Sequence, residues 1–187
     1  MIALTRNHTR EDILSEAARL FARAGFKGTS LHDIAVAVGC SKATLLYHFA
    51  SKDALLLALV EPAVQELRAL DGRLATLDGE DARATAIDGF VDLVLRYRRQ
   101  VTLVYDSLQA AEIPRFPGID ALAERLVRAF AGYSDEPVDD IAARVVLSGI
   151  CTVVIEHGDS DGIELRDALT TVAARVLRPN PRPRQES

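Results

Sequence analysis

Four hydrogen-bonding side chains lie within seven consecutive residues in the first third of the chain. An ammonium group, two hydroxyls and an imidazole can each donate to a phosphate oxygen or to the edge of a base. A small residue among them lets the backbone approach a partner closely. The four are Lys42, Thr44, Tyr47 and His48, and the small residue is Ala43.

Two short helices joined by a turn are predicted to position these side chains. The first helix carries one apolar stripe at helical spacing, formed by Leu31, Ile34, Ala35 and Val38. Ser30 and Asp33 have the spacing of a capping box at its start. Gly39 is predicted to end this helix in a left-handed conformation, and Ser41 is predicted to cap the second helix.

The second helix is predicted to run from residue 42 to residue 49, with an apolar side that faces the first helix. The residues on that apolar side are Leu45, Leu46 and Phe49. This orientation turns Thr44, Tyr47 and His48 outward. In a helix-turn-helix unit, the first turn of the second helix meets base edges in the major groove of DNA. The alternative interpretation is a packed helix pair without a nucleic-acid role.

The flanking sequence favours the DNA interpretation. From Thr9 to Leu57 the chain resembles the DNA-binding domain of the tetracycline-repressor (TetR) family, with the motifs G-F-x-x-T-S, I-A-x-x-x-G and H-F-x-S-K-D-A-L-L in order. The resemblance implies base-proximal positions at Lys42, Ala43 and Thr44. It also implies contacts to phosphates or grooves by Thr29, Ser30, Tyr47, His48 and Lys52. The family usually carries a tyrosine that contacts the DNA backbone where this sequence has Leu46, and the neighbouring Tyr47 can substitute.

Helical spacing of apolar residues continues along the chain, without strand-like alternation, so the predicted class is all-α with about nine helices. A helix-turn-helix domain is predicted at residues 1–50, and an antiparallel helical bundle for ligand binding and dimerisation at 51–178. A disordered tail is predicted at 179–187. The opening helix is predicted to begin at a capping box of Thr9 and Asp12, which leaves Arg6 in a preceding arm. Pro62 either kinks the helix that follows the first domain or separates two shorter helices.

The bundle is expected to supply a dimer interface and an effector pocket. Residues 145–155 are apolar or small on every side, and an amphipathic helix follows them, which favours a helix hairpin packed against its twin. The predicted interface residues are Leu147, Cys151, Val154, Leu169, Val172 and Val176. The resemblance implies a small effector, for which a largely apolar pocket is predicted; plain core is the alternative for the same residues. They are Phe90, Val94, Tyr97, Tyr105, Leu108, Phe130 and Ile150.

Charge is divided unevenly along the chain. Residues 1–60 carry seven Lys/Arg against five Asp/Glu, whereas the remaining residues carry fifteen against twenty-two. A mildly basic end on an acidic body presents one end to a polyanion. The longest uncharged apolar stretch is about half of the ~20 residues that span a bilayer, and no secretory signal is recognised. A cytoplasmic protein without a membrane partner is therefore expected.

Residues that commonly bind metals or catalyse reactions are sparse. Cys40 and Cys151 are the only cysteines and lack metal-site spacing, so both are expected to be free thiols; a redox sensor at Cys40 is the alternative. His157, Asp159 and Asp161 are interpreted as a turn cluster rather than metal ligands or an acid-base pair. No cofactor, metal site or catalytic set is predicted, and the protein is not expected to be an enzyme.

These features together predict a homodimeric, sequence-specific transcriptional regulator. It is expected to repress by binding double-stranded DNA at a near-palindromic operator, and to be released by a small, largely apolar effector. Two other classes stay open. One is a helical ligand-binding sensor that has lost DNA binding, for which Leu46 is the only hint. The other is a small all-α enzyme, for which no residues are nominated.

Overall fold

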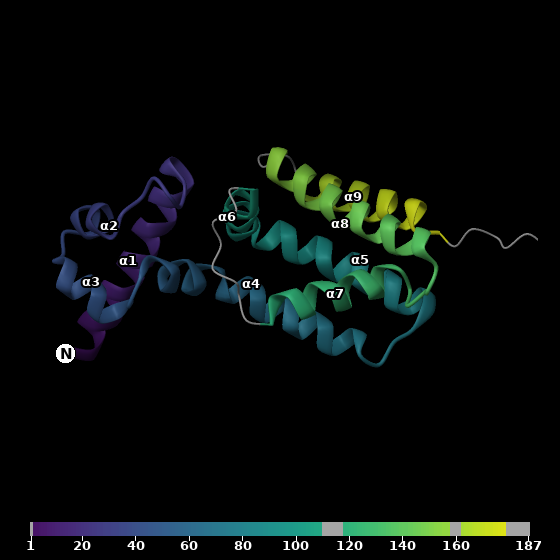
Figure 1. Cartoon of the computed structure of the whole chain (residues 1–187), viewed down its shortest axis with the longest axis horizontal. Coiled ribbons are helices and arrows are strands. Elements are labelled where there is room, and N and C mark those ends of the chain that lie inside the picture. Colours follow the sequence, from purple (N-terminus) through teal and green to yellow (C-terminus); the bar gives the residue numbers. More distant parts are fainter. Residues whose placement is uncertain (1, 110–117, 158–161, 179–187) are drawn as a thin grey trace, which may run out of the picture. The chain divides into compact units, whose positions relative to one another are not determined.

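The computed structural model describes residues 2–109, 118–157 and 162–178, and these ranges contain nine α-helices and no strand. The all-α prediction is therefore confirmed, while the predicted tail at 179–187 lies outside the described residues. The helices are α1 (Ile2–Ala24), α2 (Leu31–Val38), α3 (Lys42–His48), α4 (Lys52–Leu74), α5 (Gly79–Arg96), α6 (Arg98–Gln109), α7 (Ile119–Phe130), α8 (Pro137–Glu156) and α9 (Gly162–Val176) (Figure 1).

The chain forms two compact units that are described separately. The first unit comprises residues 1–64 with 99–117, and the second comprises 65–98 with 118–187. In the first unit, α1, α2, α3 and the start of α4 share one apolar core, against which Leu103 of α6 also packs. The buried members of this core are Ile13, Ala17, Phe21, Ile34, Ala35, Leu45, Phe49 and Leu55. The predicted domain limits stay a prediction.

The predicted caps of α2 and α3 are confirmed. The Asp33 amide donates to Ser30 Oγ at 3.1 Å, and the Ser30 amide donates to Asp33 Oδ2 at 2.8 Å, which completes the capping box. Donation by the hydroxyl and the amide of Ser30 lowers the pKa of the Asp33 carboxyl. Gly39 ends α2 with φ 76°, and the Thr44 amide donates to Ser41 Oγ at 3.0 Å. Gly39 and Ser41 therefore fix the two ends of the turn between α2 and α3.

The start of α1 differs from the prediction. The helix begins at Ile2, so Thr9 lies inside it and the proposed capping box at Thr9 and Asp12 is wrong. Arg6 belongs to the helix rather than to a preceding arm. The Arg10 guanidinium carbon lies 5.0 Å from the centroid of the Phe49 ring, a cation–π distance. A serine or threonine spaced three residues before an acidic residue is compatible with a helix interior, so the pattern alone misplaced the boundary.

α4 is one continuous helix from Lys52 to Leu74, with Pro62 in its interior. A break into two shorter helices at Pro62 is therefore wrong. Ser51 caps its start, because the Ala54 amide donates to Ser51 Oγ at 3.1 Å. Pro62 is exposed. The ring of a proline at an exposed helix position points to solvent, where its missing N–H leaves one carbonyl to water.

In the second unit, α5 packs against α7, α8 and α9 (Figure 1). The break between α5 and α6 falls at Tyr97. Arg83 on α5 is 7% exposed and donates to the carbonyl oxygens of Phe130 at 3.2 Å and Ala131 at 3.1 Å. A guanidinium at the carboxyl end of α7 satisfies carbonyls that have no partner within the helix. Arg83 thereby fastens α7 to α5.

Within the described residues, no single helix is long and apolar enough to cross a membrane. The bent pair α3 and α4 passes the same test by length and composition only. The apolar side chains Leu45, Leu55 and Leu56 of this pair are fully buried.

Candidate nucleic-acid interface

One side of α3 is exposed and the opposite side is anchored in the core. Leu45 is 0% exposed and Phe49, just after the helix, is 4% exposed. The exposed residues are Lys42, Ala43, Leu46 and Tyr47. Leu46 and Tyr47 lie one helical turn after Lys42 and Ala43, so the four share one side of α3. Leu46 is 41% exposed, so its predicted inward orientation is wrong. Because the side chain of Leu45 points into the core, the side chain of the next residue along α3, Leu46, is turned away from it.

The side chains of the first turn of α3 are held by hydroxyl groups. Ser41 Oγ and Thr44 Oγ1 lie 2.8 Å apart, and the same Ser41 oxygen accepts from the Thr44 amide. Thr44 is half-buried, so its orientation is fixed while part of its surface stays accessible. Lys42 and Ala43 precede it and are exposed. This turn therefore combines a cation, a small residue and an oriented hydroxyl.

The second turn of α3 places two rings side by side. The rings of Tyr47 and His48 meet edge-to-face with centroids 5.3 Å apart. Tyr47 is 65% exposed, whereas His48 is half-buried. Ser30 is exposed at the start of α2, with its hydroxyl bonded to the Asp33 carboxylate at 2.7 Å. The Tyr47 ring therefore offers most of the accessible surface of this pair.

Thr29 lies inside the first unit. Its side chain is 2% exposed, and its hydroxyl donates to the carbonyl oxygens of Leu20 at 3.2 Å and Gly25 at 3.0 Å. Leu20 lies in the last two turns of α1, and Gly25 follows the helix directly, so both carbonyls are near a helix end, where acceptors lack helical partners. Thr29 thus caps α1 and is not part of the exposed face.

The Lys52 ammonium group is bonded to backbone carbonyls within the same unit. Its Nζ donates to the carbonyl oxygens of Phe26 at 2.7 Å and Thr29 at 3.0 Å. The ammonium nitrogen also lies 4.3 Å from the centroid of the Phe26 ring. Lys52 therefore ties the α1–α2 connection to the start of α4.

Comparison with known proteins matches this unit to a family. The family model described as "Bacterial regulatory proteins, tetR family" matches residues 13–59, which include α2, α3 and the start of α4. Residues 13–59 therefore form a domain of the tetR family. The full-length relatives that the chain matches are transcriptional regulators rather than enzymes.

Known proteins match this chain over different lengths. The HTH-type transcriptional regulator YerO of Bacillus subtilis is 44% identical over 55 residues, which are 29% of this chain and 19% of YerO. The HTH-type transcriptional repressor AcnR of Corynebacterium diphtheriae is 26% identical over 185 residues, covering 91% of this chain and 94% of AcnR. The crystal structure of the TetR family regulator PfmR from Thermus thermophilus is 22% identical, with a TM-score of 0.64 over 91% of this chain and 99% of PfmR. This likeness confirms the predicted arrangement of an N-terminal helix-turn-helix domain and a helical C-terminal part.

The predicted effector residues are divided between the two units. Four are buried in the second unit, namely Phe90, Val94, Phe130 and Ile150. The rings of Phe90 and Phe130 meet edge-to-face with centroids 5.8 Å apart, as in a packed core. Tyr97 is half-buried in the same unit, and Tyr105 is half-buried on α6 in the first unit. The side chain of Leu108 lies outside the described residues.

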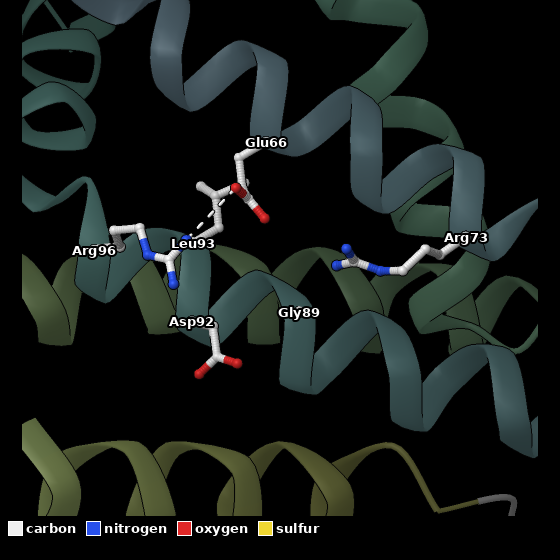
Figure 2. Close-up of a pocket in the computed structure, with 6 residues that line it drawn as sticks. All are labelled: Glu66, Arg73, Gly89, Asp92, Leu93 and Arg96. Carbon is white, nitrogen blue, oxygen red and sulfur yellow. Dashed lines mark ion pairs between the residues drawn. The ribbon is translucent and has the colours of Figure 1, made fainter.

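A polar cavity of about 210 Å³ lies between α4 and α5 (Figure 2). Its lining residues are Glu66, Arg73, Gly89, Asp92, Leu93 and Arg96, none of which was predicted. Arg96 pairs with Glu66 at 3.7 Å, and Asp92 accepts from Arg166 at 2.6 Å. Charged residues on two amphipathic helices resemble an ordinary solvated face, so little in their spacing indicates this cavity.

The predicted dimer residues differ in exposure. Val154 and Leu169 are buried within the second unit, and Leu147 and Cys151 are half-buried. Burial raises the pKa of the Cys151 thiol to about 11, so the thiol is neutral at physiological pH. Val172 and Val176 are exposed on α9. Val154 on α8 and Leu169 on α9 therefore face the interior of the unit, and the interface itself stays a prediction.

Replacing Lys52 with methionine is expected to lower the free energy of unfolding by about 1–2 kcal/mol, because two carbonyl groups lose a charged donor. Urea denaturation followed by circular dichroism measures the change. Lys42→Met is the control; Lys42 is exposed at the start of α3, so its replacement should change stability by less than about 0.5 kcal/mol. Equal stability of the two variants would contradict a structural role for Lys52.

Proposed function

We propose that this regulator is a homodimeric repressor that inserts α3 of each protomer into the major groove of a near-palindromic operator. The observation that carries the proposal is the exposed side of α3, which presents Lys42, Ala43 and Tyr47 on a helix anchored by buried residues. Its residues begin at the helix N-terminus, the part of a recognition helix that meets base edges. We expect the protein in the cytoplasm, with access to its operator.

The side chains of this face have different proposed roles. Lys42 and Tyr47 are exposed donors suited to phosphate oxygens, and His48 contributes from its accessible edge. Ser30 is also exposed, and donation of its hydroxyl to a phosphate would replace its bond to Asp33. Ala43 and Thr44 lie closest to the bases. The small side chain of Ala43 allows the helix to approach the base pairs, and the oriented hydroxyl of Thr44 can discriminate between base edges. Thr29 and Lys52 support this face from within, through their bonds to backbone carbonyls.

A second copy of the chain is the proposed partner of an apolar stripe on α8 and α9. Six large apolar side chains on these helices are between 52% and 73% exposed. They are Val138, Ile141, Val145, Ile163, Val172 and Val176. On α8 the stripe continues at helical spacing through small residues, including Ser148 and Gly149, which allow close approach of a partner helix. Because α8 packs on α9, the same two-helix surface on a second copy forms a four-helix interface.

The proposed switch is linkage between an effector and the operator. A ligand that binds better to a dimer unable to bind DNA weakens operator binding by the same factor that the operator weakens ligand binding. A complete switch requires a difference of about 5 kcal/mol between the two states. A small, largely apolar molecule is the proposed effector, with the buried residues around Phe90 and Phe130 as its site.

Selection of binding sequences from a random duplex pool is expected to enrich an inverted repeat. The half-site centres should lie about one helical turn apart, ~34–36 Å, because both recognition helices enter one face of the duplex. Affinity should fall steeply with salt, and Lys42→Ala should reduce the salt slope by about one per protomer if Lys42 neutralises a phosphate. Thr44→Val should leave this slope unchanged and shift sequence preference. Absence of binding at low salt would support the sensor alternative instead.

Val145→Asp and Val172→Asp are each expected to disrupt the dimer, because each buries an unpaired carboxylate at the interface. The dimer dissociation constant should rise by at least about tenfold, which corresponds to 1.4 kcal/mol. Sedimentation equilibrium measures this constant, and Ala69→Asp at an exposed position of α4 is the control. A wild-type protein that is monomeric at tens of micromolar would contradict the proposed interface.

A screen for small molecules that release the selected duplex is expected to yield largely apolar ligands. Phe90→Leu should weaken their effect by about tenfold, because it removes ring contacts in the proposed site. Arg73→Ala, on the polar cavity, should leave their effect unchanged. Fluorescence polarisation of a labelled duplex measures release. If all active ligands are charged and depend on Arg73, the effector site lies in the polar cavity and the apolar pocket is wrong.

A further inference from the structure

Two apolar residues, Ala43 and Leu46, are neighbours on the exposed side of α3. They stand at i and i+3 on the helix, so their side chains lie on adjacent turns of the same face. Leu46 is 41% exposed and Ala43 is also exposed, whereas Leu45 between them is fully buried. The face proposed to meet DNA therefore contains two adjacent apolar side chains between the polar side chains of Lys42 and Tyr47.

Leucine has no hydrogen-bond donor, so Leu46 cannot hold a phosphate or a polar base edge. The apolar group that a base pair displays in the major groove is the C5 methyl of thymine. Both Ala43 and Leu46 lie within the first two turns of α3, the part of a recognition helix that comes nearest to the bases. An apolar side chain at this place is complementary to that methyl group.

The backbone of this turn is held in place independently of the two apolar side chains. Ser41 caps α3 through the Thr44 amide at 3.0 Å and contacts the Thr44 hydroxyl at 2.8 Å. Leu45 and Phe49 anchor the opposite side in the core. Ala43 and Leu46 are therefore presented on a fixed support, and a partner of defined shape can fit against them.

We propose that Leu46, together with Ala43, forms a contact for the C5 methyl group of a pyrimidine in each operator half-site. This inference rests on the proposed DNA-binding function and adds a specificity determinant to it. Thymine is the expected base, and 5-methylcytosine presents the same methyl group. Discrimination at this position comes from methyl burial instead of hydrogen bonding.

Deoxyuridine substitution tests the contact, because it removes the methyl group and leaves base pairing intact. The enriched duplex is synthesised with one thymine of each half-site replaced in turn, and the full-length protein is titrated at fixed salt. One position should lose affinity by about fourfold per half-site, as expected for one buried methyl group. At that position, a duplex with 5-methylcytosine should bind more tightly than the same duplex with cytosine.

Variants assign the methyl contact to Leu46. Leu46→Ala should bring the thymine-to-deoxyuridine affinity ratio at that position close to one, and Leu46→Met should retain most of it. Val36→Ala is the matched control, since Val36 is 65% exposed on α2, outside α3, and the ratio should not change. Thermal unfolding of each variant verifies that the fold is kept.

Two results would overturn the proposal while leaving DNA binding intact. One is tight wild-type binding with no deoxyuridine penalty at any position. The other is a penalty that Leu46→Ala leaves unchanged. Absence of binding to any duplex at low salt is a different result, because it overturns the proposed DNA-binding function and this inference together.

Discussion

The anchoring of α3 in the core of the first unit is the constraint on which the proposed DNA-binding surface depends. A helix of seven residues is too short to be stable alone in water, since nucleation costs more than so few hydrogen bonds return. Two buried side chains, Leu45 and Phe49, and the cap at Ser41 supply the missing stability. The exposed face of α3 is held in place because its opposite face is packed in the core. The proposed recognition of bases by the exposed face therefore depends on the burial of apolar side chains on the other.

The motif residues that the family resemblance implies as DNA contacts divide into two groups in the structure. Thr29 and Lys52 satisfy backbone carbonyls at the end of α1 and in the connection that follows it. Lys42 and Tyr47 instead extend from the surface. A motif of this kind therefore combines residues that build the support with residues that use it. Burial and hydrogen bonding separate the two groups, whereas their positions in the sequence do not.

The sequence predicted what depends on local chemistry and missed what depends on packing. Ser30, Asp33 and Gly39 act within one helical turn, so their roles could be read from spacing. The orientation of Leu46 could not, because a short apolar run fits more than one helix face. On α8, residues 145–155 are apolar or small all round, and only contact with α5 and α7 decides that Val154 is buried and Val145 exposed. The exposed stripe therefore required the structure.

The two units share one helix, α4, which contains a proline near the point where the units divide. α4 contributes Leu55 to the core of the first unit and Leu70 to the buried residues of the second. Pro62 lies just before residues 64 and 65, where the units divide. Because proline cannot donate the backbone hydrogen bond of its turn, bending α4 costs less there than at other positions. Pro62 is therefore the position at which α4 bends most easily, and it lies two residues before the division between the two units.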